Sequence, residues 1–315
     1  MVIRALITGA AGFAGSYLVE ECLAAGYEVH GTSVSRTASS GVPAGLTLHE
    51  CDLGQPEAIA LLVADLEPNR VFHLAGQAAV GAAWGDPTAT FVSNLFLTQH
   101  VLEAVRRGAP EARVLAVGSG EAYGAVDPGR APVVEEEPFR PLNPYGVSKA
   151  AADLLALQYF LAFDLSVVRV RPFNHIGPRQ QRGFVLADFA AQLAAIERGE
   201  APPVLATGNL EGARDFTDVR DVARAYRLAL ELGMPGAVYN VCSGIATPIG
   251  DLLDILLNAC RVTVRVETDP SLYRPVDRHA VLGCNVALRE ATTWQPAIPI
   301  SQTVIDTLAY WRNAH

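Results

Sequence analysis

The feature that most constrains the fold is a glycine-rich turn near the N-terminus, TGAAGFAG, which contains Gly9, Gly12 and Gly15. It stands between a strand-like run, VIRALI at 2–7, and a helical pattern, FAGSYLVEECLAA at 13–25. Glycines in this position let the backbone turn sharply, approach a pyrophosphate and pack the helix close to the sheet. Free N–H groups at the start of the helix then face the phosphates. Because the strand and the helix that such a motif requires are both present, the sequence predicts a dinucleotide-binding unit.

The first half of the chain continues with apolar strand-like runs separated by helical or loop segments: YEVHGTS, LTLHE, RVFHLA, RVLAVG and LSVVRVR. This alternation predicts a parallel sheet covered by helices on both faces, and right-handed crossovers make it doubly wound. After Arg171 the pattern loosens. We expect an α/β fold with a Rossmann-type dinucleotide-binding domain at 1–172 and a return segment at about 217–241. A smaller mixed α/β substrate-binding domain is expected at 173–216 and 242–315.

Charge and composition exclude several classes of partner. The net charge of −9 argues against nucleic acid or an anionic membrane as the main partner. The sequence has no apolar run of membrane-spanning length, no signal-peptide layout and no His, Cys and Asp pattern with metal-ligand spacing. Five dispersed cysteines without a C-x-x-C pair fit reduced thiols. We therefore expect a cytoplasmic protein without a metal site.

The stretch NPYGVSKAAAD at 143–153 places Tyr145 and Lys149 four residues apart. On a helix this spacing puts the phenol and the ammonium on one face. An ammonium about 5 Å away, at an effective dielectric near 20, favours the phenolate by roughly 3 kcal/mol. The pair therefore predicts a phenol pKa lowered toward neutrality, as a proton-transfer group needs. The ordinary alternative is a solvated helix face on which the lysine stem covers the ring.

The end of the second strand bears on the choice of coenzyme. An acidic residue there would hold a ribose 2′-hydroxyl and repel a 2′-phosphate. The sequence has Thr32, Ser33 and Arg36 instead. These residues favour NADP(H) and leave NAD(H) possible, with the alternative that Arg36 points into solvent.

Six motifs in order along the chain resemble the extended short-chain dehydrogenase/reductase superfamily: GAAGFAG, CDL at 51–53, HLAGQAAV at 73–80, VSNLFLTQHVLEA with Asn94, VGSGEAYG at 117–124, and YGVSK. Within the superfamily, RPFNHIGPRQ followed by GFVLADFAAQL is most similar to the GDP-4-keto-6-deoxymannose reductases. GDP-mannose 4,6-dehydratases are close relatives, but their opening loop carries a Gln-Asp pair where this chain has Phe13 and Ala14.

The resemblance implies roles for residues at the matching positions. It implies catalytic roles for Ser119, Tyr145, Lys149, Glu121 and Asn94. The expected coenzyme contacts are Gly9, Gly12, Phe13, Ala14, Gly15, Ser33, Arg36, Asp52, Leu53, Leu74, Ala75, Gly76, Tyr145, Lys149 and His175. The expected substrate contacts are Ser119, Glu121, Asn174, Arg214 and Arg274.

Some of these residues have plainer interpretations. Asn94 could be a packing amide, Arg214 a surface ion-pair partner of Asp215, and Arg274 a solvated loop residue. We expect His73, His49 and His30 to be packed rather than catalytic, and VEEEP at 134–138 to form a solvated acidic loop.

The activity that the resemblance implies is hydride transfer from NADPH to C4 of a GDP-linked 4-keto-6-deoxy sugar, with GDP-D-rhamnose as product. Glu121 keeps a dehydratase activity as an alternative, because a glutamate at this position is the C5 base of the dehydratases. A nucleotide-sugar 4-epimerase and a dinucleotide-sensing regulator without activity are the further alternatives. Family members pair two long helices in a four-helix dimer interface, so we expect a homodimer.

Overall fold

A computed structural model describes residues 2–34, 43–272 and 281–314. Its larger part is a seven-stranded sheet with the order β10-β6-β5-β4-β1-β2-β3, in which every neighbouring pair is parallel. The strands are β1 (Arg4–Thr8), β2 (Glu28–Ser33), β3 (Leu46–Glu50), β4 (Arg70–His73), β5 (Arg113–Val117), β6 (Val167–Pro172) and β10 (Val238–Val241). The strand order reverses direction on either side of β1, as in a doubly wound fold. The predicted fold class is confirmed.

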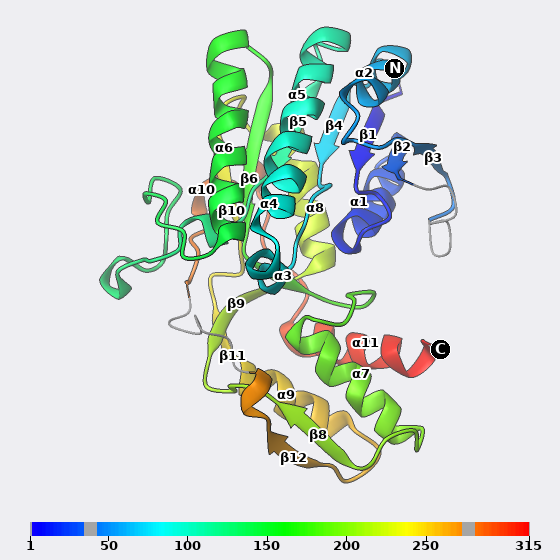
Figure 1. Cartoon of the computed structure of the whole chain (residues 1–315), viewed down its shortest axis with the longest axis vertical. Helices are drawn as coiled ribbons and strands as arrows, with labels where there is room; N and C mark the ends of the chain where they lie inside the picture. Colours follow the sequence, from blue (N-terminus) through cyan, green and yellow to red (C-terminus); the bar gives the residue numbers. More distant parts are fainter. Residues whose placement is uncertain (1, 35–42, 273–280, 315) are drawn as a thin grey trace.

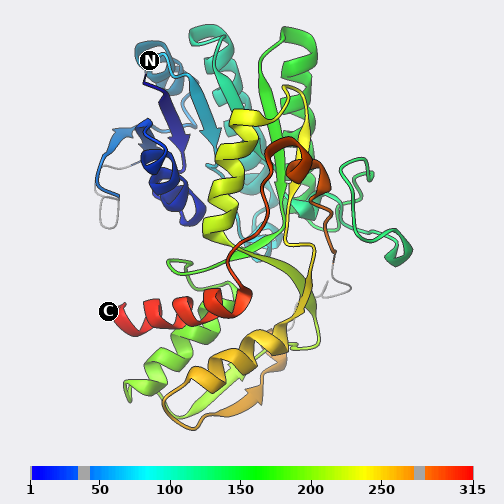
Figure 2. The same cartoon turned by 180° about the vertical axis from the view of Figure 1, so that it is seen from behind.

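Helices cover both faces of this sheet (Figures 1 and 2). Along β1, Ile7 faces one layer of helices and Leu6 the other, because successive side chains of a strand point to opposite faces. The first layer contains α1 (Phe13–Ala24), α8 (Val219–Leu232) and α10 (Val286–Thr292). The second contains α2 (Pro56–Leu66), α5 (Leu97–Gly108) and α6 (Pro144–Phe163). Three short elements precede α5: α3 (Val80–Gly85), α4 (Pro87–Phe91) and the π-helix η2 (Val92–Phe96).

A smaller lobe lies beyond the carboxyl ends of the large sheet (Figure 1). It has a three-stranded sheet of β7 (Asn174–Ile176), β9 (Ala213–Asp218) and β11 (Ala246–Pro248), and a pair of strands, β8 (Val204–Thr207) and β12 (Arg265–Thr268). Its core is formed with α7 (Val185–Glu197), α9 (Ile249–Ala259) and α11 (Ile300–Asn313). The described residues also contain three one-turn 3-10 helices: η3 (Gly120–Ala122), η4 (Pro128–Arg130) and η5 (Pro270–Leu272). The exact domain boundaries stay a prediction.

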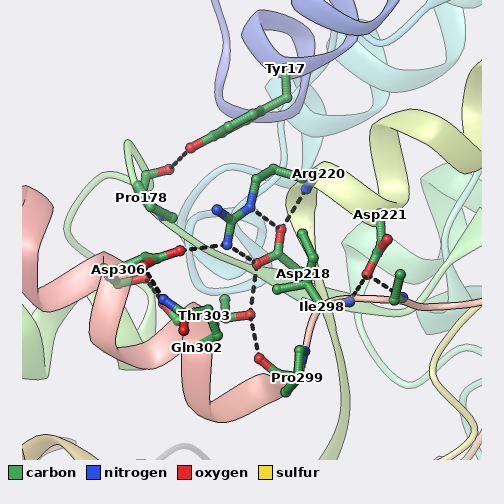
Figure 3. Close-up of polar contacts among 12 residues, drawn as sticks. Tyr17, Pro178, Asp218, Arg220, Asp221, Ile298, Pro299, Gln302, Thr303 and Asp306 are labelled. Carbon is green, nitrogen blue, oxygen red and sulfur yellow. Dashed lines mark hydrogen bonds and ion pairs between the residues drawn. The ribbon is translucent and has the colours of Figure 1, made fainter.

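The two lobes are joined where β9 runs into α8 (Figure 3). Asp218, which caps α8, is buried, and its carboxylate accepts from the backbone N–H and the guanidinium of Arg220 at 2.7 to 2.9 Å. The same carboxylate accepts the Thr303 hydroxyl of α11 at 2.7 Å. Arg220 also pairs with Asp306 of α11 at 2.8 Å. The last helix of the chain is therefore fixed to the start of α8.

Two further contacts reinforce this joint. The Asp221 carboxylate accepts the backbone N–H groups of Ala297 and Ile298, both at 2.8 Å, and so holds the segment that leads into α11. On the other side, Tyr17 of α1 donates its hydroxyl to the Pro178 carbonyl at 3.0 Å (Figure 3). The segment that follows β7 is thereby tied to the helix that follows the glycine turn.

The expectation of a solvated acidic loop at 134–138 is wrong for two of its three glutamates. Glu135 accepts the backbone N–H of Asn240 at 2.7 Å, and burial raises the pKa of its carboxyl group. Glu137 is only 6% exposed and pairs with Arg130 at 3.0 Å. The segment fails to behave as a solvated loop because it lies against β10 at the end of the sheet. Among the described residues, no helix is long and apolar enough to cross a membrane.

Candidate active site

The glycine turn has the geometry that a pyrophosphate requires. Strand β1 ends at Thr8, and Gly9 takes φ +72°, in the left-handed region that favours glycine. A Cβ on Gly15 would lie 2.0 Å from the Gly9 carbonyl oxygen, so only glycine allows α1 to pack this close. The residue before the helix, Gly12, has no side chain that could cap α1. The first N–H groups of α1 are therefore left for a ligand.

A cavity of about 210 Å³ opens beside this turn. It lies at the carboxyl ends of the strands, where open α/β sheets bind their ligands. Six predicted coenzyme contacts line it: Gly9, Gly12, Ser33, Asp52, Leu53 and Ala75. Thr32 lines it too, and so do four residues that the sequence prediction missed: Ala11, Val34, Cys51 and Leu97. Ala11, Cys51 and Leu97 lie within the motifs GAAGFAG, CDL and VSNLFLTQHVLEA, and Val34 follows Ser33, so the motifs held a signal for these residues.

The other predicted coenzyme residues that the structure describes lie outside this cavity. Phe13 stacks on His175 of β7, with ring centroids 5.8 Å apart and an interplanar angle of 7°. Ala14 and Leu74 pack against the core layer of α1 and α8. His175 bonds to the Phe173 carbonyl through Nδ1 at 3.2 Å, and burial lowers the pKa of its imidazole. Arg36 lies outside the described residues.

The predicted tyrosine and lysine are both buried at the start of α6. Asn143 caps this helix, Pro144 is its first residue, and Tyr145 and Lys149 are 8% and 9% exposed. The Tyr145 hydroxyl is hydrogen-bonded to Ser119. The Lys149 ammonium donates to the Val117 carbonyl at the end of β5, at 3.0 Å. The structure thus brings the predicted serine, tyrosine and lysine together at the carboxyl edge of the sheet.

The expected direction of the Tyr145 shift is wrong. Burial raises the pKa of Tyr145 to about 12, and the Glu121 charge adds to the rise, while the hydrogen bond with Ser119 opposes it. Burial likewise lowers the pKa of Lys149 to about 8. The prediction counted the attraction between the charges but not the cost of removing each charge from water, which is larger here. At neutral pH the phenol therefore holds its proton.

Glu121 lies on the one-turn helix η3 next to these groups. Ser119 caps this turn by accepting the Glu121 N–H at 3.1 Å. Gly146 lets α6 approach the turn, because a Cβ at this position would lie 2.6 Å from the Glu121 carbonyl oxygen. The carboxylate accepts the side-chain amide of Asn143 at 3.0 Å.

Asn94 lies in the π-helix η2, a rare form that often marks functional sites. It is 1% exposed and donates to the Ser148 hydroxyl at 2.9 Å, and this hydroxyl in turn donates to the Tyr145 carbonyl at 2.7 Å. Its Oδ1 accepts the Gln77 N–H at 2.9 Å, which requires the glycine at position 76, where a Cβ would lie 2.6 Å from that oxygen. Asn94 therefore supports α6 through Ser148.

His73 is packed, as expected. Its ring lies between the Thr8 and Thr98 hydroxyls at 2.8 and 3.0 Å. Burial and the Lys149 charge lower the pKa of His73 to about 3, so the ring is neutral. Among the described residues, no group of three His, Cys, Asp or Glu side chains could hold a metal ion.

Two of the predicted substrate residues, Asn174 and Arg214, lie on strands of the small lobe. Asn174 is exposed at the start of β7, and Arg214 lies on the neighbouring strand β9, where its guanidinium donates to the Ala213 carbonyl at 2.7 Å. The carboxylate of Asp215 is occupied by Ser243, whose N–H and hydroxyl it accepts at 2.8 and 2.6 Å. Arg274 lies outside the described residues.

Known proteins resemble this chain over nearly its whole length. The model of the family described as GDP-mannose 4,6 dehydratase matches residues 6–307. The GDP-6-deoxy-D-mannose reductase of Pseudomonas aeruginosa is 37% identical, over 99% of this chain and 98% of the relative. The structure of RMD from Pseudomonas aeruginosa complexed with NADPH has a TM-score of 0.84 at 35% identity, with 99% of each chain covered. The UDP-glucose 4-epimerase of Thermus thermophilus in complex with NAD has a TM-score of 0.88 at 31% identity, covering 99% of this chain and all of the other.

Proposed function

This chain belongs to the GDP-mannose 4,6-dehydratase family, within the extended short-chain dehydrogenases/reductases, and we propose that it is a reductase of GDP-4-keto-6-deoxy-D-mannose that forms GDP-D-rhamnose. It is an enzyme of the NAD(P)-dependent nucleotide-sugar class, so the regulator without activity is set aside. The observation that carries the proposal is the buried group at the carboxyl edge of the sheet, in which Tyr145 contacts Ser119 and lies one helical turn before Lys149. A ketone reductase needs a proton donor at the carbonyl oxygen, and burial raises the pKa of this phenol to about 12, so it holds a proton that it can donate.

The chain offers a fitting place for a dinucleotide. A side chain at Gly9 or Gly15 would collide with nearby backbone atoms, so the turn accepts only glycine at these positions. The cavity beside the turn extends to the end of β2. Hydroxyl side chains at Thr32 and Ser33 stand there in place of an acid, which supports NADP(H) over NAD(H) without excluding the latter. One relative is complexed with NADPH and another with NAD, so the relatives are compatible with either coenzyme. When bound, NADPH supplies the hydride that the reduction requires.

The residues of the chain supply the remaining chemistry. Tyr145 gives its proton to the oxygen at C4 as the alcohol forms, and Ser119 holds that oxygen and the phenol in one hydrogen-bonded group. The buried ammonium of Lys149 stabilises the negative charge that develops on the oxygen. In this proposal Glu121 and Asn174 bind sugar hydroxyls, and Arg214 and Arg274 bind the diphosphate, for which guanidinium groups are suited.

One assay tests the proposed reaction. Purified protein is given GDP-4-keto-6-deoxy-D-mannose and NADPH, and the loss of nicotinamide absorbance is followed. We expect turnover, and Tyr145→Phe should reduce it by about 10² to 10⁴-fold while leaving NADPH affinity nearly unchanged. Glu121 in the site is the observation that favours the second candidate, a dehydratase. Dehydration of GDP-mannose by the wild-type protein, without reduction of the ketone, would replace the first proposal with the second.

We also propose a homodimer formed through α6 and the neighbouring segment η2. Val147, Leu154 and Leu161 follow one another at seven-residue spacing on α6 and are 39%, 56% and 69% exposed. On η2, Val92 and Phe96 are 45% and 47% exposed. A stripe of this kind on two neighbouring helical segments supports a helix-to-helix interface with a second copy.

A further inference from the structure

The side-chain amide of Asn143, which none of the sequence predictions includes, is bound at both ends within the site. Its Oδ1 accepts the Gly146 N–H at 2.7 Å and so caps α6, and its Nδ2 donates to Glu121 Oε2 at 3.0 Å. A backbone N–H can only donate and a carboxylate can only accept, so the two bonds fix which end of the amide is which. Asn143 is 8% exposed, and water has little access to compete for either bond.

This amide links the helix of the proton donor to the turn of the carboxylate. Tyr145 lies two residues after Asn143 on α6. Ser119 bonds to Tyr145 and also caps the turn that carries Glu121. Among the described residues, hydrogen bonds reach the Glu121 carboxylate only at Oε2. The Asn143 amide is therefore the group that sets the orientation of this carboxylate relative to the phenol.

The orientation matters because two reactions of a 4-keto sugar compete in such a pocket. The ketone at C4 acidifies the hydrogen on C5. A carboxylate that reaches this hydrogen takes it as a proton, the C–H electrons form the C4–C5 double bond of an enolate, and the negative charge moves to the C4 oxygen. Return of a solvent-derived proton to C5 regenerates the ketone. The Tyr145 and Ser119 hydroxyls that assist reduction would also stabilise this enolate.

We propose that Asn143 is a positioning residue that selects reduction over enolisation by holding the Glu121 carboxylate against the start of α6 and away from the C5 hydrogen. The inference rests on the proposed function, because it takes a 4-keto sugar as the bound ligand. In this arrangement Glu121 serves to bind a sugar hydroxyl. Loss of the amide donor frees the carboxylate to act as a base.

The test is hydrogen exchange at C5 in the absence of coenzyme. GDP-4-keto-6-deoxy-D-mannose is incubated in D₂O with each protein, and deuterium at C5 is located by NMR and counted by mass spectrometry. Asn143→Ser keeps a good helix-capping oxygen but loses the amide N–H group that donates to Glu121, and its shorter side chain has only a hydroxyl in place of the amide. We expect it to exchange C5 at least about ten times faster than the wild-type protein, because Glu121 is then unrestrained.

A second variant and a double variant make the result specific. Asn143→Asp keeps the size and the capping oxygen but faces Glu121 with a second carboxylate, so it should also speed up exchange; it provides the test if the serine variant does not fold. Adding Glu121→Gln should remove the gain. The inference is overturned if the wild-type and variant proteins exchange C5 at the same rate, or if none of them exchanges it. It is also overturned if the faster exchange persists after Glu121→Gln is added. The NADPH assay tests the proposed function separately. If the wild-type protein does not reduce the ketone, the proposed function is overturned, whereas the exchange experiment still decides the inference about Asn143.

Discussion

For single residues in the site, burial outweighs the proximity of charges. Tyr145 and Lys149 are each less than a tenth exposed, and burial disfavours the charged form of both. The pKa of the phenol rises to about 12 and that of the ammonium falls to about 8. The phenol is therefore a stable proton donor at neutral pH, and the lysine is the group whose charge changes near physiological pH.

Lys149 can be observed directly because it is the only lysine in the 315-residue sequence. Protein labelled with ¹³C-lysine should give one side-chain ε-carbon resonance, and it should titrate near pH 8 instead of near 10.4, the value for an exposed lysine.

The same shift predicts how stability depends on pH. Since the folded-state pKa of Lys149 lies below the unfolded one, the unfolded chain binds more protons between these values, and the free energy of unfolding should rise with pH from about 8 to about 10.5. The rate of ketone reduction should fall above pH 8 as the ammonium loses its charge.

Tyr145→Phe is the control for this titration, because it removes the phenol and leaves the lysine buried. Its resonance should keep a midpoint near pH 8. A midpoint near 10 in the wild-type protein would show that burial does not set the charge of this lysine.

At the scale of elements, the sequence predicts the strands well and the special local geometries poorly. The run RVLAVG becomes β5 because strand composition and buried position agree, and LTLHE becomes the edge strand β3 because its strand composition agrees with its pairing to β2. The π-helix around Asn94 was not predicted, and neither was the bond that Asn94 accepts from the N–H of Gln77, 17 residues earlier in the chain. Likewise, the burial of Glu135 depends on Asn240, which lies 105 residues along the chain. Contacts of this kind leave no periodic pattern in the sequence.

The exposed stripe on α6 gives a prediction for this element. Leu154→Arg places a charge in the middle of the proposed helix-to-helix interface, and we expect the dimer to dissociate to monomers at micromolar concentration in sedimentation analysis. Leu61→Arg is the matched control, because Leu61 is 72% exposed on α2, which is separated from α6 by α5 (Figure 1). A dimer that persists in Leu154→Arg, or that is lost equally in Leu61→Arg, would argue against the proposed interface.

For the whole molecule, the site depends on two lobes that keep their relative position. The glycine turn, Tyr145 and Lys149 belong to the large sheet, whereas Asn174 and Arg214 belong to the strands of the small lobe. Residues 281–314 connect the two, since α10 packs beside α8 and α11 packs in the small lobe. Sequence order alone did not reveal this crossing, because α10 and α11 are adjacent in the chain but lie in different cores.

The joint itself can be tested with one hydroxyl. Thr303→Val removes the 2.7 Å bond from α11 to the buried Asp218 carboxylate at nearly constant volume. Hydrogen bonds to charged groups contribute roughly 1.5–3 kcal/mol, so the free energy of unfolding should fall by about that amount, and amide exchange in α11 should accelerate more than in the central strands. Thr307→Val is the control, because Thr307 is equally buried on the same helix but its hydroxyl donates only to the Thr303 carbonyl, at 2.7 Å. Equal losses of unfolding free energy in the two variants would mean that the bond to Asp218 adds nothing beyond local helix packing. A larger loss in Thr303→Val would identify this bond as a connection that holds the two lobes together, and with them the two halves of the site.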